Sequence, residues 1–139
     1  MSLITWNKDF VLGIDQFDAH HQHLISLIND TTLSLEKNPP YEELVIVLNS
    51  LVDYAWYHFN AEEQWMKEHS FPLLSEHEII HRQFSAKIAD LQSRLKDNSR
   101  TVAKELSTYL NFWLIDHIVI CDSLYASFAG KQKRAVLMT

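Results

Sequence analysis

The sequence predicts an all-α protein, an antiparallel up-down four-helix bundle with an N-terminal arm. Apolar residues recur every three or four positions in four separate stretches, which is the period of a helix with one buried face. Short polar or proline-containing segments separate these stretches, so neighbouring helices should run antiparallel. The 139 residues include only two glycines and three prolines, too few turn formers for a many-stranded β fold.

The length of the chain fits one domain with a buried core. We expect an N-terminal arm at residues 1–16, the bundle at residues 17–130 and a tail at residues 131–139. Four apolar residues of the arm should pack over one end of the bundle: Trp6, Phe10, Val11 and Ile14.

The first two helices are separated by a pair of prolines. Asp18 can cap the first helix, which should end before the turn at Asn38-Pro39-Pro40. Its inward positions are Phe17, His21, Leu24, Ile28 and Leu35. Those of the second helix are Leu44, Leu48, Leu51, Ala55, His58, Glu62 and Trp65.

The last two helices meet at a polar turn near residues 97–99. Ser75 and Glu78 form a capping box that should open the third helix, and Gly130 should end the fourth. The inward positions of the third helix are His77, His81, Phe84, Ile88, Leu91 and Leu95. Those of the fourth are Leu106, Leu110, Trp113, His117, Cys121, Leu124 and Phe128.

Composition argues against several partners and locations. The net charge of −6 and the pI near 5.7 disfavour nucleic acid, because phosphate binding needs clustered Lys and Arg. No apolar run approaches the roughly 18–20 residues of a membrane span, and the N-terminus has no signal-peptide pattern. The single cysteine, Cys121, fits a reducing compartment. The sequence therefore predicts a cytoplasmic protein that binds neither nucleic acid nor membrane.

Histidines and carboxylates lie on or beside the inward face of every predicted helix. The set comprises His21, His58, Glu62, His77, His81, His117 and the nearby Asp122. They fall early in the first and third helices and late in the second and fourth. In an antiparallel bundle, all seven should therefore meet at one end of the core.

This set predicts a metal centre. An unpaired buried carboxylate costs several kcal/mol, and no Lys or Arg lies in the predicted seams to neutralise one. A hydrogen-bonded polar core is the simpler interpretation, but five imidazoles exceed what two acids need. Seven groups are too many for one tetrahedral zinc and suit two octahedral ions with bridging carboxylates. Iron is favoured, with manganese and zinc as alternatives.

Four segments closely resemble the haemerythrin family, and its bacterial branch in particular: Asp18–Leu24, His58–Glu63, His77–His81 and Trp113–Asp122. The resemblance implies a non-haem site of two iron ions with a bridging oxo or hydroxo group. It implies that His77, His81 and His117 hold one iron and that His21 and His58 hold the other. Glu62 and Asp122 would bridge the two ions. Dioxygen would bind reversibly, as hydroperoxide, at the iron held by His21 and His58.

Two local features bear on this ligand set. Where the family often has glutamine, this chain has His20, but His21 shares the seam of Leu24 and Ile28 and is the predicted ligand. His117 and Asp122 are five residues apart, about 140° around an ideal helix. Either they straddle two metal ions, or a local π-bulge brings them together.

Apolar side chains beside the ligands should wall a pocket for dioxygen: Phe59, Trp113, Leu114 and Ile118. His23 and His69 should be solvated, and Cys121 should be a buried small hydrophobe rather than a redox thiol.

The resemblance and the small number of acids predict an oxygen carrier or store rather than an enzyme. Two functional alternatives remain. One is a di-iron oxidoreductase acting on peroxide or nitric oxide, and the other is an oxygen- or redox-sensing module. Dioxygen is the expected ligand, and no protein partner is predicted.

Overall fold

The computed structural model describes the backbone of residues 3–97 and 99–138, and their side chains except at positions 99, 114, 115, 119, 120 and 131–138. These residues form helices and no strands, so the predicted all-α class is confirmed. In chain order the elements are η1 (Lys8–Phe10), α1 (Asp15–Glu36), α2 (Tyr41–Glu68), α3 (Leu74–Leu95), α4 (Ser99–Asp116), η2 (His117–Asp122) and α5 (Ser123–Met138).

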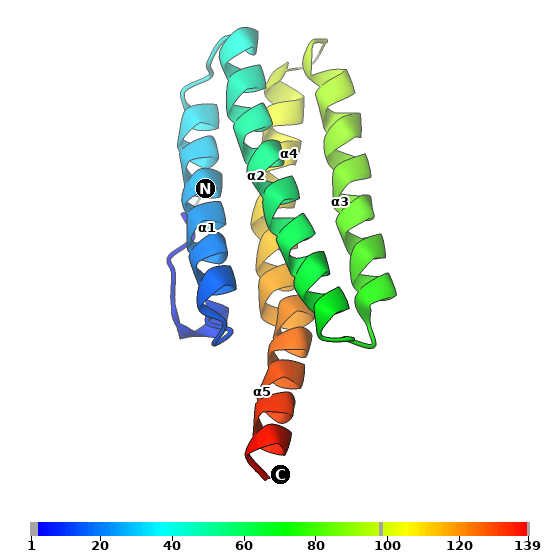
Figure 1. The fold of residues 1–139 in the computed structure, drawn as a ribbon. Helices are drawn as coiled ribbons and strands as arrows, with labels where there is room; N and C mark the ends of the chain where they lie inside the picture. The colour runs from blue at the N-terminus through cyan, green and yellow to red at the C-terminus, as the bar shows by residue number, and fades with distance from the viewer. Residues whose placement is uncertain (1–2, 98, 139) are drawn as a thin grey trace.

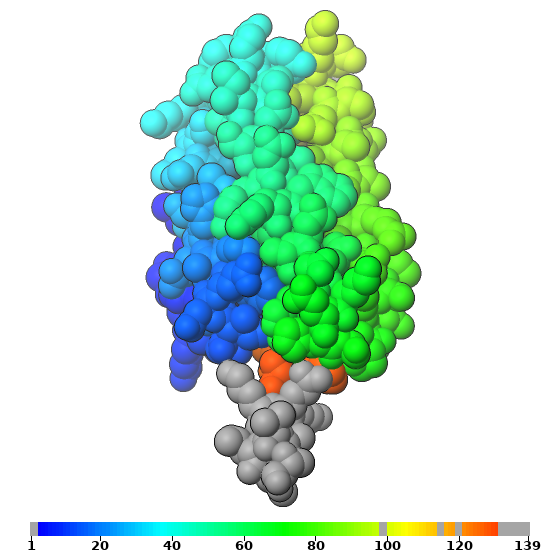
Figure 2. All heavy atoms as spheres, in the orientation of Figure 1, coloured from blue at the N-terminus to red at the C-terminus, as the bar shows by residue number. Residues whose placement is uncertain are grey.

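The four long helices α1 to α4 form a closed, up-down bundle (Figure 1). Each packs against its neighbour in sequence, and α1 also packs against α4. η2 and α5 continue α4 in the same direction, and α5 extends past the end of the bundle (Figure 1). Side chains fill the spaces between α1, α2 and α3 on the face shown in Figure 2. Within the described residues, no helix is both long and apolar enough to cross a membrane.

Two predicted helix caps are wrong. α1 begins at Asp15, one turn before Asp18, whose carboxylate instead accepts hydrogen bonds from the backbone N–H groups of Leu12 (2.7 Å) and Gly13 (3.2 Å). α3 begins at Leu74, and no side-chain hydrogen bond caps it, so Ser75 already lies inside the helix. The Asp18 side chain therefore fastens the arm to α1 instead of starting the helix.

The N-terminal arm lies along α1. The Asn29 side chain accepts a hydrogen bond from the backbone N–H of Ile4 and donates one to its carbonyl, both at 2.8 Å. Trp6 stacks on Phe10, and both pack against the core of the bundle. Val11 is 52% exposed, so its predicted packing is wrong.

The apolar seams of α1, α2 and α3 lie as the period predicts, apart from residues at the ends such as Leu35 and Trp65, which are only partly buried. The predicted seam of the fourth helix is correct as far as His117. Beyond His117, Cys121 is half-buried and Leu124 is 50% exposed, whereas Asp122 and Tyr125 are fully buried. The last predicted residue, Phe128, is partly buried against a core cluster.

The cause of this shift is η2, a π-helical segment. A π turn closes over five residues instead of four, so it moves the following inward positions by one residue. The helix also continues through Gly130, so the predicted stop there is wrong. η2 brings Asp122 Oδ1 within 3.1 Å of His117 Nε2. Of the two explanations of their spacing, the structure therefore supports the π-bulge.

Candidate metal centre

The structure brings all seven predicted site residues together in the core, each at most 4% exposed. They come from the start of α1, the end of α2, the start of α3 and η2. The up-down arrangement places these four segments at the same end of the bundle (Figure 1).

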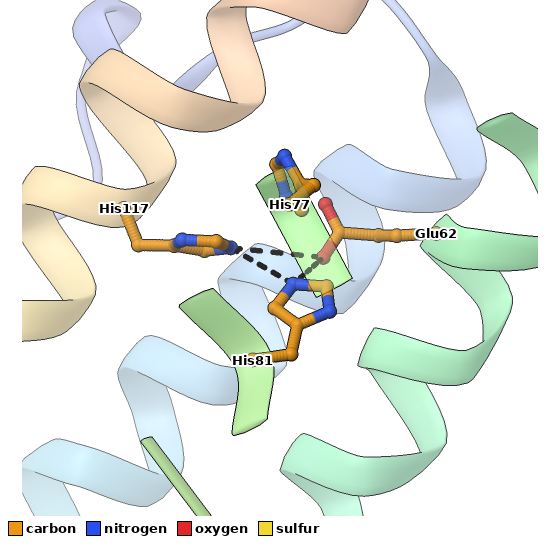
Figure 3. A group of neighbouring side chains, drawn as sticks. All are labelled: Glu62, His77, His81 and His117. Carbon is orange, nitrogen blue, oxygen red and sulfur yellow. Dashed lines mark hydrogen bonds and ion pairs between the residues drawn. The ribbon is translucent and has the colours of Figure 1, made fainter. Parts of the chain in front are cut away.

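One group of possible ligands consists of Glu62, His77, His81 and His117 (Figure 3). One ligand atom from each residue lies within 4.8 Å of the others. The Nε2 atoms of His81 and His117 are 3.2 Å apart, and Glu62 Oε1 is 3.5 Å from His81 Nε2. Three imidazoles and one carboxylate oxygen therefore converge.

A second group consists of His21, His58, Glu62 and Asp122. The Nε2 atoms of His21 and His58 are 3.0 Å apart. Glu62 Oε1 lies 3.0 Å from His58 Nε2, and Asp122 Oδ2 lies 3.0 Å from His21 Nε2.

The two carboxylates lie between the two groups. Glu62 belongs to both. Asp122 turns Oδ2 toward His21, while its Oδ1 is 2.9 Å from His77 Nε2 and 3.1 Å from His117 Nε2. Each acid therefore lies beside histidines of both groups, as a carboxylate that bridges two metal ions must.

The donor atoms fit a metal ion better than they fit one another. Glu62 Oε1, both Asp122 oxygens and His77 Nε2 are buried and have no hydrogen-bond partner within the described structure. Neighbouring nitrogens lie close to these atoms but not in hydrogen-bond geometry. In each group, the ligand atoms instead lie within 4.8 Å of one another, as atoms around a shared metal ion would. In the described part of the chain, no Lys or Arg forms an ion pair with either acid. Cations would satisfy these atoms and neutralise both charges.

Electrostatics within the cluster follow from the contact of acids with imidazoles. Burial opposes ionisation of Glu62 and Asp122, but their histidine partners outweigh it and hold both carboxyl pKa values below the usual range. Burial likewise opposes protonation of His21 and His81, yet Asp122 raises the pKa of His21 and Glu62 raises that of His81. The cluster thus attracts positive charge, whether it is supplied by protons or by metal ions.

Three further residues hold the cluster from outside, and the sequence did not predict their contacts. The Tyr125 hydroxyl donates to Glu62 Oε2 at 2.5 Å. Glu63 Oε2 lies 2.8 Å from His81 Nδ1, and His20 Nδ1 lies 2.9 Å from His58 Nδ1. Burial lowers the pKa of His20 to about 4, and the neighbouring His58 and His21 contribute to the shift. Tyr125 lies three residues after Asp122, so an inward-facing Asp122 predicts that Tyr125 shares its face of the helix.

Aromatic rings stack on the faces of two ligand imidazoles. Phe59 stacks on His81 with centroids 3.9 Å apart, and Trp113 stacks on His117 at 4.6 Å. Ile118 is fully buried beside them in the same core cluster. The side chain of Leu114, the fourth predicted pocket residue, lies outside the described residues. Of the two histidines predicted to be solvated, His23 is exposed, but His69 is half-buried and stacks on Trp65.

This fold and this cluster define a helical-bundle metal-binding protein. The model of the family "Hemerythrin HHE cation binding domain" matches residues 12–129, and the chain belongs to the haemerythrin family.

The chain is also similar to bacteriohemerythrins from several bacteria. Bacteriohemerythrin of Stenotrophomonas maltophilia (strain R551-3) is 30% identical over 126 residues, which cover 91% of this chain and 81% of the relative. Bacteriohemerythrin of Methylococcus capsulatus is 26% identical over 129 residues, covering 90% and 95%. A solved crystal structure, described as that of a leucine-to-phenylalanine mutant, superposes with a TM-score of 0.79 at 23% identity. The match covers 91% of this chain and 97% of the solved one, and shows the shared fold.

Proposed function

We propose that this protein binds dioxygen reversibly at two iron ions and serves as an oxygen carrier or store. The observation that carries the proposal is the pair of overlapping ligand groups that share Glu62. His77, His81 and His117 would hold one ion, and His21 and His58 the other. Glu62 and Asp122 would bridge the ions together with an oxo or hydroxo group. Ferrous ions bound by these residues would supply the two electrons that dioxygen accepts on binding and returns on release.

The two ligand groups are unequal, and this supports one binding position for dioxygen. Counting the shared acids, one ion would have three imidazoles and two carboxylates, and the other would have two imidazoles and two carboxylates. The ion held by His21 and His58 would therefore have one protein ligand fewer. An open position of this kind is what a metal needs to bind an external ligand.

The side chains around the ligands favour a carrier over an enzyme. Phe59 and Trp113 stack on ligand rings and exclude water from them. The Tyr125 hydroxyl already donates a hydrogen bond to Glu62, so it is not free to act as an acid toward a substrate. A site with only two carboxylates supplies little negative charge to stabilise highly oxidised iron. The half-buried Cys121, the chain's single cysteine, is consistent with the cytoplasm as the location of this carrier.

A visible spectrum tests the proposal. Iron-loaded protein is reduced without air, exposed to air and then degassed. We expect an absorption band that appears with air and disappears on degassing. Rapid irreversible oxidation with turnover of peroxide or nitric oxide would instead support the oxidoreductase alternative. A reversible spectrum whose main consequence is altered binding of a protein partner would support a sensor. No spectral response to air would contradict all three.

A Trp113→Ala substitution should accelerate autoxidation of the air-exposed protein roughly ten-fold, without changing its iron content. Trp113 covers His117, and its loss should admit water and protons to the centre. The matched control is Phe112→Ala, because Phe112 is the preceding residue and is 71% exposed. The decay of the visible band at constant temperature measures the rate. Equal rates for the two variants would exclude Trp113 as a barrier.

A further inference from the structure

His20 makes a specific contact with one of the proposed ligands. Its side chain is 7% exposed, and its Nδ1 lies 2.9 Å from His58 Nδ1. The two rings meet edge to face, with centroids 5.0 Å apart. Because His58 Nε2 faces Glu62 and His21, the contact with His20 is on the side of the ring that faces away from the proposed metal.

The proposed metal centre fixes the direction of this hydrogen bond. A histidine that binds metal through Nε2 carries its proton on Nδ1 and donates it to an outer acceptor. His58 must therefore donate from Nδ1, and His20 must accept at Nδ1. Such an acceptor holds the ligand ring in one tautomer and one orientation.

Only some of the ligands have an outer partner of this kind. His81 Nδ1 meets the carboxylate of Glu63 at 2.8 Å. The Nδ1 atoms of His21 and His117 are buried and have no hydrogen-bond partner within the described structure. Each ligand group thus contains an imidazole with an outer side-chain acceptor. The acceptor is an anion beside His81 and a neutral ring beside His58.

We infer that His20 is a positioning residue for the metal ion held by His21 and His58, which it serves by accepting the Nδ1 proton of His58. This inference rests on the proposed two-metal function. An anionic acceptor increases the electron donation of its ligand more than a neutral one does. Glu63 and His20 therefore make the two metal positions unequal, and the ion beside His20 is the more weakly held.

The competing explanation is that His20 only fills space. Its ring lies 5.2 Å from the ring of Tyr57 and 5.8 Å from that of Phe17, so packing alone could account for its burial. Shape and hydrogen bonding can be separated by substitution. Asn places an oxygen acceptor where His places Nδ1, Leu has nearly the shape of Asn without the acceptor, and Phe keeps a ring without the acceptor.

The test is an anaerobic titration of metal-free protein with ferrous iron in competition with a chelator. We expect wild-type protein to bind two equivalents with different affinities. In His20→Leu and His20→Phe the weaker equivalent should lose about 10–100-fold in affinity, and the stronger should be unchanged. His20→Asn should stay within about three-fold of wild type, and His20→Asp should bind the weaker equivalent more tightly than His20→Asn. The matched control His23→Asn changes an exposed histidine and should have no effect.

The outcomes separate this inference from the function on which it rests. Wild-type protein that binds fewer than two equivalents would refute both. Wild-type protein that binds two, with His20→Phe retaining both affinities or His20→Asn no better than His20→Leu, would refute the role of His20 alone. Circular dichroism of the metal-free variants checks folding. If His20→Leu does not fold, the comparison of His20→Asn with His20→Phe still decides.

Discussion

A Glu62→Gln substitution should abolish stoichiometric binding of both metal ions. Glu62 is the residue that belongs to both ligand groups, and its carboxylate supplies one of the two negative charges at the centre. Glutamine keeps the shape and can still accept the hydrogen bond from Tyr125, so the fold should survive. The loss in affinity should exceed the roughly 10–100-fold that removal of an outer partner costs.

The neighbouring Glu63 provides the control for this prediction. Glu63→Gln removes the same charge one residue further along, but Glu63 contacts the outer nitrogen of His81 rather than the centre. This variant should still bind two equivalents, one of them about 10–100-fold more weakly. Metal analysis after anaerobic loading with ferrous iron and desalting measures both. If Glu62→Gln kept two equivalents, Glu62 would not be a bridging ligand.

Helical periodicity was enough to predict the bundle. The steps of three and four residues placed the buried faces of α1, α2 and α3, because a straight α-helix keeps one register along its length. The same regularity explains the error after His117. Periodicity cannot show where a helix takes up one extra residue. Cys121 and Leu124 were therefore assigned to the inward face, Asp122 was placed only beside it, and Tyr125 was missed.

The cluster itself was also accessible from the sequence. His21, His58, Glu62, His77 and His81 lie on regular inward positions, and antiparallel topology alone brings them to one end. The outer contacts were not accessible, because they depend on side-chain directions across helices. His20 lies about 100° from His21 around α1, yet its ring reaches the far side of His58 on α2.

Removal of metal should destabilise the protein more at pH 8 than at pH 6. In the metal-free protein, the raised pKa values of His21 and His81 stabilise the fold fully below their ordinary value of 6.5, and this stabilisation is lost as pH rises through the raised values. The lowered pKa values of Glu62 and Asp122 act oppositely. Their stabilisation is present above the ordinary values of 4.5 and 3.8 and is lost in acid.

The metal-free protein should therefore gain most from the cluster between about pH 4.5 and pH 6.5, where acids are ionised and histidines protonated. As the pH rises from 6 toward 8, His21 and His81 hold fewer protons, so metal ions meet less competition for their ring nitrogens. Free metal at about 1,000 times its Kd contributes about 4 kcal/mol. In a chain of this size that raises Tm by about 8–16 °C.

Thermal unfolding followed by circular dichroism, without air and with or without ferrous iron, measures this difference at the two pH values. The Glu62→Gln variant is the control, because it should show no metal-dependent shift at either pH. A shift as large at pH 6 as at pH 8 would mean that protons and metal ions do not compete for the same nitrogens. The imidazoles would then not be the ligands, because a metal ion that binds a ring nitrogen must compete with the proton for that nitrogen.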